Sequence, residues 1–166
     1  KRQGIHAGMV MAKASTLFEI MSKDKVDPDE MMFHMNNDLY QTKTAGMFVT
    51  CILGEYDLVS EEIRWVNAGH QPALIRTHEG KYSEYISSST PLGVIRHKDK
   101  SVYKLEKTKL SSSRFYVFTD GLSESLDKNG DEIGIEGSIK IIESNFNTDL
   151  KKQLKDVTSE VVKVAG

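Results

Sequence analysis

The chain has 166 residues, of which 39% are hydrophobic and 28% are charged. This length suits one domain with a single core, and the hydrophobic fraction is too high for a disordered chain. With 22 Lys and Arg against 24 Asp and Glu, the net charge of -2 does not favour a nucleic-acid or membrane-surface binder. No apolar run approaches the roughly 18 residues of a membrane span, and the single cysteine excludes an internal disulfide framework. We therefore expect a cytoplasmic protein without a membrane segment. The chain lacks an initiator Met and its first residues already look mid-domain, so we also expect a fragment of a longer protein.

Two helices are expected at the start of the chain. Apolar residues recur at helical spacing over Ala7–Met21. The second helix spans Asp27–Thr42, with Asp27 as N-cap, Pro28 in the first helical position and Glu30 completing a capping box. Both segments are rich in methionine, which is most often core and alternatively forms an adaptable contact surface. The methionines concerned are Met9, Met11, Met21, Met31, Met32 and Met35.

The hydrophobic period then changes to two, which predicts strands. Short turns join the first four strands, so we expect an antiparallel meander over Met47–Leu58, Glu62–Ala68, Ala73–Thr77 and Lys81–Ile86. Val102–Lys107 alternates and predicts another strand. The continuous apolar run Arg114–Thr119 is typical of a central, buried strand.

Two helices close the predicted pattern. The first spans Ile135–Phe146, and residues 147–149 cap the second, which places Leu150, Leu154, Val157 and Val161 on one face. The order of elements indicates an α+β fold in which helices pack on a sheet or a sandwich.

Asp120 and His70 are the candidate functional residues. Asp120 follows the apolar run and precedes Gly121, so it either points a carboxylate toward a hard cation or makes an ordinary Asp-Gly turn. His70 lies between two predicted strands, as an active-site side chain or a turn residue. Taken alone, each residue favours the turn.

Several segments together resemble the SpoIIE/RsbU-type bacterial protein phosphatases of the PPM superfamily of metal-dependent Ser/Thr phosphatases. The resemblance covers nearly the whole chain and includes the helix opening at Gly4–Ala12. The segments that carry it, in chain order, are Met47-Phe48-Val49-Thr50, Asn67-Ala68-Gly69-His70-Gln71-Pro72, Pro91-Leu92-Gly93-Val94 and Phe118-Thr119-Asp120-Gly121-Leu122-Ser123-Glu124.

This resemblance implies an α-β-β-α sandwich of antiparallel sheets around a cluster of Mn²⁺ or Mg²⁺ ions. It also implies hydrolysis of phosphoserine or phosphothreonine by a metal-bound water. By the same resemblance, Asp120 and Gly121 are expected at the metal, and Asn67 and His70 next to the active site.

The resemblance also implies that the chain, residues 1–166, is one incomplete phosphatase domain. The family's first strands and its first metal-binding aspartate would precede Lys1. Its last strand, with the closing aspartates, would follow Gly166. Asp120 is then the one acidic ligand matched within the chain.

The leading hypothesis is a protein Ser/Thr phosphatase that acts on a phosphorylated STAS-type anti-anti-sigma protein in partner-switching signalling. An upstream sensor or response-regulator domain of the same parent protein would control it, and a second copy of the chain is a further candidate partner. The alternative is a phosphatase-like binding or sensing module without turnover.

Overall fold

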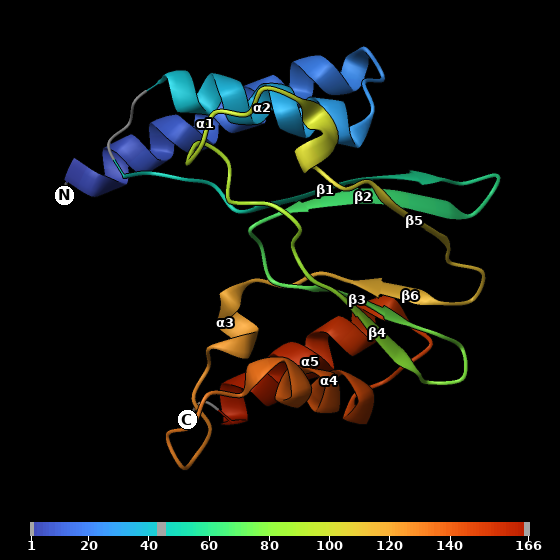
Figure 1. The fold of residues 1–166 in the computed structure, drawn as a ribbon. Helices are drawn as coiled ribbons and strands as arrows, with labels where there is room; N and C mark the ends of the chain where they lie inside the picture. The colour runs from blue at the N-terminus through green and yellow to red at the C-terminus, as the bar shows by residue number, and fades with distance from the viewer. Residues whose placement is uncertain (1, 43–45, 165–166) are drawn as a thin grey trace.

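A computed structural model, which describes residues 2–42 and 46–164, shows four layers in the order helices, sheet, sheet, helices (Figure 1). The predicted α-β-β-α arrangement is therefore confirmed. The helices of the first layer are α1 (Arg2–Lys23) and α2 (Pro28–Gln41). The helices of the last layer are α3 (Asp120–Ser123), α4 (Gly134–Ser144) and α5 (Leu150–Val164).

Each sheet has three described strands, and every pair is antiparallel. The first sheet has the order β1-β2-β5, with β1 at Cys51–Asp57, β2 at Glu62–Ala68 and β5 at Glu106–Lys109. The second has the order β4-β3-β6, with β3 at Ala73–Arg76, β4 at Tyr82–Tyr85 and β6 at Arg114–Tyr116. The prediction of one continuous meander is wrong, because the link from β2 to β3 carries the chain from one sheet to the other.

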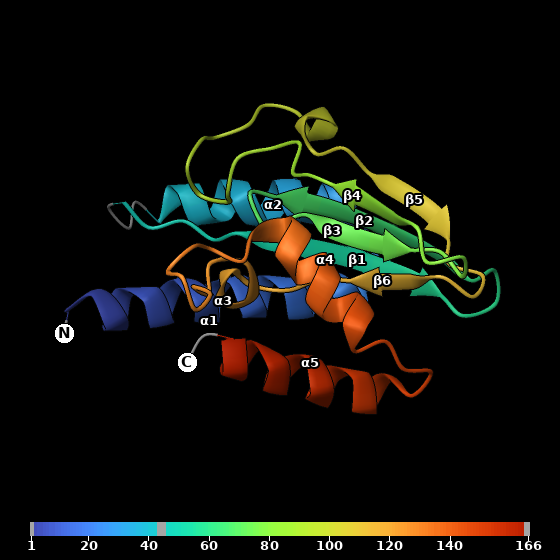
Figure 2. The ribbon, with the colours of Figure 1, turned by 90° about the horizontal axis from the view of Figure 1, so that it is seen from below.

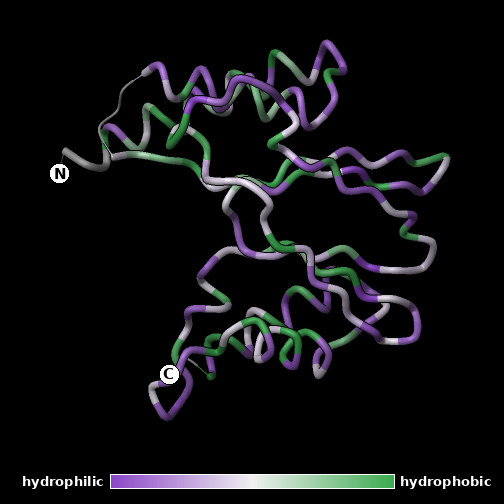
Figure 3. The backbone as a smooth tube through the Cα atoms, viewed as in Figure 1, coloured by the Kyte–Doolittle hydropathy of each residue, from purple (hydrophilic) through white to green (hydrophobic). Residues whose placement is uncertain are grey.

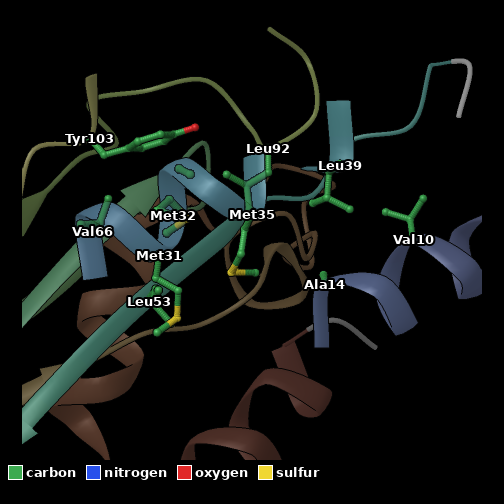
Figure 4. Close-up of a cluster of buried hydrophobic side chains, with 11 residues drawn as sticks. Val10, Ala14, Met31, Met32, Met35, Leu39, Leu53, Val66, Leu92 and Tyr103 are labelled. Carbon is green, nitrogen blue, oxygen red and sulfur yellow. The ribbon is translucent and has the colours of Figure 1, made fainter. Parts of the chain in front are cut away.

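The core between the helices and the first sheet is built mainly from α2. Met31, Met32, Met35 and Leu39 are buried on one face of α2 and pack against Val10 and Ala14 of α1 and against Leu53 and Val66 of the strands (Figure 4). The methionines of α2 are thus core residues. Met9 and Met11 of α1 are 64% and 54% exposed, so the two helices use methionine differently.

Aromatic side chains fill the space between the two sheets. Trp65 of β2 is 1% exposed and meets Tyr85 of β4 and Phe115 of β6 edge to face, with ring centroids 5.1 Å apart in both pairs. Ile63 and Ile75 complete this buried cluster. The aromatic contacts hold the sheets face to face and therefore position the loops at their ends.

Two predictions about β-structure are corrected. Among the described strands, Arg114–Thr119 is not central: β6 is three residues long and half-buried, it pairs with β3 on one side, and Val117 after it is 51% exposed. Val102–Lys107 is not a strand either, since residues 100–102 form a 3-10 turn and β5 begins only at Glu106. In both cases the apolar pattern predicted more strand than forms, because a strand also needs partners in space that the pattern does not specify.

The capping box predicted at α2 does not form. Asp27 occupies the N-cap position without a side-chain capping hydrogen bond, and its carboxylate pairs instead with Arg64 of β2 at 3.0 Å. The cap predicted for the last helix is confirmed, because Asp149 Oδ1 accepts hydrogen bonds from the N–H groups of Lys151 and Lys152.

The helices of the two outer layers extend beyond the described strands. Seen from below, α5 lies beside β6 and beyond the edge of its sheet (Figure 2).

Apolar stretches occur in the strands and in the helices that cover them (Figure 3). Within residues 2–42 and 46–164, no helix combines the length and the apolar character that crossing a bilayer requires.

Candidate active site

Three loops meet at one end of the sandwich and line an open cavity of about 300 Å³. The first leads into β1, the second is the crossing from β2 to β3, and the third joins β6 to α3 (Figure 1). The cavity lies where the chain passes between the sheets, and its wall is formed by Thr50, Gly69, His70, Gln71, Thr119, Asp120 and Glu124.

The side chain of Asn67 shapes the crossing loop. Its Oδ1 accepts a hydrogen bond from the N–H of His70 at 2.9 Å, and its Nδ2 donates to the carbonyls of His70 and Gln71 at 3.3 and 3.0 Å. Asn67 is 5% exposed, so these bonds satisfy a buried carboxamide. The residue acts on the cavity through the backbone, because it fixes the turn that carries His70.

Gly69 is required at this turn for two reasons. Its φ of +67° lies in the left-handed region, and a Cβ there would be 2.5 Å from the ring of Pro91. Its N–H donates to Ser87 Oγ, and that hydroxyl also donates to the carbonyl of Asn67. Pro91 and Ser87 thus both contact the turn that leads to the cavity.

His70 faces Thr50 across the cavity wall. Thr50 Oγ1 and His70 Nδ1 are 3.1 Å apart, at hydrogen-bond distance, and the tautomer of the imidazole decides which group donates. Thr50 directly precedes β1 and His70 follows β2, so this pair lies at the end of the first sheet. The pair supplies polar groups to the cavity rather than an apolar wall.

Asp120 reaches the same cavity from the start of α3, after the loop that follows β6. It is the first residue of α3, it is exposed, and its carbonyl accepts a hydrogen bond from the N–H of Glu124, which lines the cavity as well. Gly121 follows outside the lining, and its carbonyl accepts a hydrogen bond from Ser125 Oγ at 2.7 Å. Carboxylates placed in this way are the donors that Mg²⁺ and Mn²⁺ prefer.

The donor set of the described residues is partial. Within residues 2–42 and 46–164, no group of three His, Cys, Asp or Glu side chains could hold a metal ion. Asp120 can contribute one ligand, but Mg²⁺ coordinates about six oxygens, so these residues do not form a metal site by themselves.

The structure brings together three of the four predicted site residues. His70 and Asp120 line the cavity, and Asn67 supports it from behind. Gly121 lies next to Asp120 in the chain but is not part of the wall. Thr50 and Glu124 also line the cavity, but they were assigned no role from the sequence. Their membership of the segments that resemble the SpoIIE/RsbU family was the one signal that could have identified them.

Comparison with solved structures identifies the fold class as that of the PP2C-type phosphatases. The SiaA-PP2C domain of Pseudomonas aeruginosa matches with a TM-score of 0.79 at 13% identity, over 98% of this chain and 63% of that one. The RsbU and RsbW domains of Rv1364c from Mycobacterium tuberculosis match with a TM-score of 0.73 at 19% identity, over 98% and 45%.

The family follows from the sequence. Residues 3–166 match the model of the Stage II sporulation protein E (SpoIIE) family, and the chain belongs to that family. Phosphoserine phosphatase RsbU of Bacillus subtilis is 21% identical over 164 residues, which are 98% of this chain and 48% of that protein. Phosphoserine phosphatase RsbP of the same organism is 25% identical over 125 residues, or 73% and 30%. The chain thus spans half or less of the length of these curated relatives.

Proposed function

We propose that this chain is part of a protein serine/threonine phosphatase that removes phosphate from phosphoserine or phosphothreonine of a regulatory protein. The observation that carries the proposal is the cavity in which His70 and Asp120 meet at the crossing between the sheets. Membership of the SpoIIE family and the likeness to two phosphoserine phosphatases support it.

The metal requirement is part of the same proposal. Asp120 is proposed as one ligand of a Mn²⁺ or Mg²⁺ site, with Gly121 beside it, and the remaining ligands would come from outside residues 2–42 and 46–164. A divalent cation supplies Lewis-acid chemistry to phosphate-ester hydrolysis. Asn67 and the Gly69 turn hold His70 at the wall of the same cavity.

We also propose that further strands of the parent protein complete the sandwich, so that residues 1–166 are one incomplete domain. A groove of about 530 Å³ lies between β6 and α5, and it is lined largely by apolar side chains, including Phe115, Ile142 and Leu154. Leu150 and Leu154 of α5 are 63% and 68% exposed there. A strand beside β6 would cover both residues.

The proposed substrate is a phosphorylated STAS-type anti-anti-sigma protein. A sensor or response-regulator domain upstream in the parent protein would control the reaction, and a second copy of the chain is a candidate partner. The likeness to RsbU and RsbP, and to a structure in which RsbU and RsbW domains occur together, supports a multidomain signalling protein. Such a protein would work in the cytoplasm.

A binding or sensing module without turnover is the second candidate. The partial donor set around Asp120 favours it, because one aspartate cannot hold a catalytic metal pair. The two candidates differ in whether the parent protein turns over a phosphoserine substrate when Mn²⁺ is supplied.

The deciding experiment uses the parent protein and its Asp120→Asn variant. With Mn²⁺ and a phosphoserine peptide, we expect turnover by the wild type and at least a hundredfold lower kcat in the variant. The variant keeps the shape and loses the charge that a cation needs, so calorimetry should also show weaker Mn²⁺ binding.

Asp131→Asn is the matched control. Asp131 is exposed in the turn at residues 127–131 and does not line the cavity, so its replacement should leave turnover and Mn²⁺ affinity unchanged. A wild-type parent that binds its partner and hydrolyses nothing would establish the binding module instead. Full activity in Asp120→Asn would remove Asp120 from the metal site.

A further inference from the structure

A short segment, residues 89–93, lies between α2 and the cavity, and we call it the strap. Leu92 pairs with Val49: the N–H of Val49 donates to the carbonyl of Leu92 at 3.0 Å, and the N–H of Leu92 donates to that of Val49 at 2.8 Å. The ring of Pro91 lies against Gly69. The strap therefore touches the residue before Thr50 and the residue before His70.

The opposite side of the strap is attached to α2 by Asn36. Asn36 is 0% exposed; its Oδ1 accepts from the N–H of Gly93, and its Nδ2 donates to the carbonyl of Ile95, both at 2.9 Å. Leu92 lies beside Met35 and Leu39 of the same helix (Figure 4). The strap thus connects the buried face of α2 to the cavity wall.

A buried carboxamide at this point needs an explanation beyond packing. An apolar side chain would fill the space next to Leu92 without a desolvation cost, whereas Asn36 is tolerated only because both of its polar atoms are bonded. One directed bond holds Gly93 at the end of the strap, and the other holds Ile95 just after it, which fixes a register that apolar contacts do not fix.

We propose that Asn36 is a positioning residue for the cavity: through Gly93 and Pro91 it sets the distance between Thr50 and His70. The inference rests on the proposed function in that the cavity is taken as the active site. Its structural part stands apart from any activity, because it concerns the Thr50–His70 pair itself.

The first test records the imidazole ¹⁵N signals of His70 in the wild type, Asn36→Ala and Asn37→Ala. Asn37 is the matched control: it makes a similar pair of bonds, to the N–H and the carbonyl of His97, both at 3.1 Å, but beyond the strap. We expect the Nδ1 signal to move in Asn36→Ala and to stay at its wild-type position in Asn37→Ala.

Loss of stability alone does not predict this pattern. Each variant loses two hydrogen bonds to the backbone of residues 93–97, and both lose the bond from Asn36 Nδ2 to Asn37 Oδ1 at 3.2 Å. A merely structural Asn36 would therefore lower both melting temperatures and leave the His70 signal of the folded protein unchanged. That result, or an equal shift in both variants, overturns the proposal.

A second pair of variants covers the case in which Asn36→Ala does not fold. Gly93→Ala strains the strap, because Gly93 has a φ of +86°, and keeps Asn36 itself, while the added Cβ lies at contact distance, 3.5 Å, from Leu39 of α2. Gly130→Ala imposes a similar strain at a φ of +85° in a turn with nothing within 4 Å of the added Cβ. The His70 signal should move in the first variant and not in the second; an unmoved signal in Gly93→Ala overturns the proposal.

Kinetics of the parent protein give an independent readout. We expect Asn36→Ala to lower kcat at least tenfold with KM within about twofold, because small displacements of site groups mainly affect the chemical step. Asn37→Ala should stay within about threefold of the wild type. If the wild type is active and both variants lose activity equally, the positioning role of Asn36 is refuted and the proposed function stands. If the wild type is inactive, the proposed function is refuted and the ¹⁵N test still decides the positioning role.

Discussion

Asn67 shows how one side chain can hold a whole turn. All three of its hydrogen bonds go to the backbone of residues 70 and 71. Asn67→Ala removes them and leaves the N–H of His70 without its acceptor. We expect the free energy of unfolding to fall by about 1–3 kcal/mol, measured by chemical denaturation.

Asn129→Ala is the control for this substitution. Asn129 is exposed, and its side chain bonds only to Asp127 among the described residues, so its loss should cost less than about 0.5 kcal/mol. Equal costs at the two positions would show that the Asn67 turn contributes nothing special to stability.

Glu143 carries a pH-dependent part of the stability. Arg76 donates two hydrogen bonds to its carboxylate at 2.7 and 2.8 Å, the OH of Tyr82 donates a third, and they lower the pKa of Glu143 from 4.5 to about 2 against an opposing effect of burial. A lowered pKa means that the stabilisation is complete above about pH 4.5 and disappears as the pH falls toward 2.

Glu143→Gln should therefore be less stable than the wild type at pH 7 by about 1 kcal/mol, a modest value because the carboxylate is 44% exposed and screened. The difference should shrink between pH 4.5 and pH 2, measured by thermal unfolding. Glu79→Gln, at an exposed pair with Lys81, should follow the wild type throughout. A difference that does not change with pH would contradict the assignment.

At the scale of elements, α1 and α2 form a unit that packs on the first sheet. Leu17 of α1 is half-buried against the core that α2 builds, while the neighbouring turns of α1 expose Met11 and Phe18. We expect this helix pair to act as a regulatory switch that relays a sensor or partner signal to the site, because catalysis tolerates little misplacement.

Leu17→Gly tests the switch. The change weakens helix propensity and packing together, by about 2–4 kcal/mol. In the parent protein it should reduce the fold-activation by the upstream signal before the fold is lost. The measurement is phosphatase activity with and without that signal.

Thr16→Gly serves as the reference for this experiment. It introduces the same flexible backbone at an exposed position one residue earlier and should leave the activation ratio unchanged. If folded Leu17→Gly responds to the signal as the wild type does, the helix pair is only a packing layer.

At the scale of the whole molecule, the described residues provide only part of the metal site that the proposed reaction needs. Asp120 comes from the start of α3 and His70 from the crossing loop, but among the described residues too few donors gather for a metal pair. The chain of 166 residues on its own should therefore bind Mn²⁺ weakly and show little turnover of p-nitrophenyl phosphate. Titration calorimetry and a colorimetric assay measure both, and robust turnover would mean that the remaining ligands lie within the chain after all.

The sequence patterns determined most of the elements, and the resemblance to the SpoIIE/RsbU family implied the four layers. Helical periodicity predicted α1 and α2, alternation predicted β2, and Asp149 was correctly predicted to cap α5. These features depend on contacts within a few residues of each other, so local physics is enough to predict them. The recognised segments likewise selected His70 and Asp120, which the fold brings to one cavity.

Only the tertiary structure decided the rest. The crossing from β2 to β3, the edge position of β6, the pairing of Asp27 with Arg64 and the attachment of the strap to Asn36 join residues that are far apart in the chain. Hydrophobic patterning says which side chains are buried but not which ones meet, because burial is non-directional. The Thr50–His70 pair therefore follows from how the two sheets and α2 pack together, and not from any short segment of the sequence.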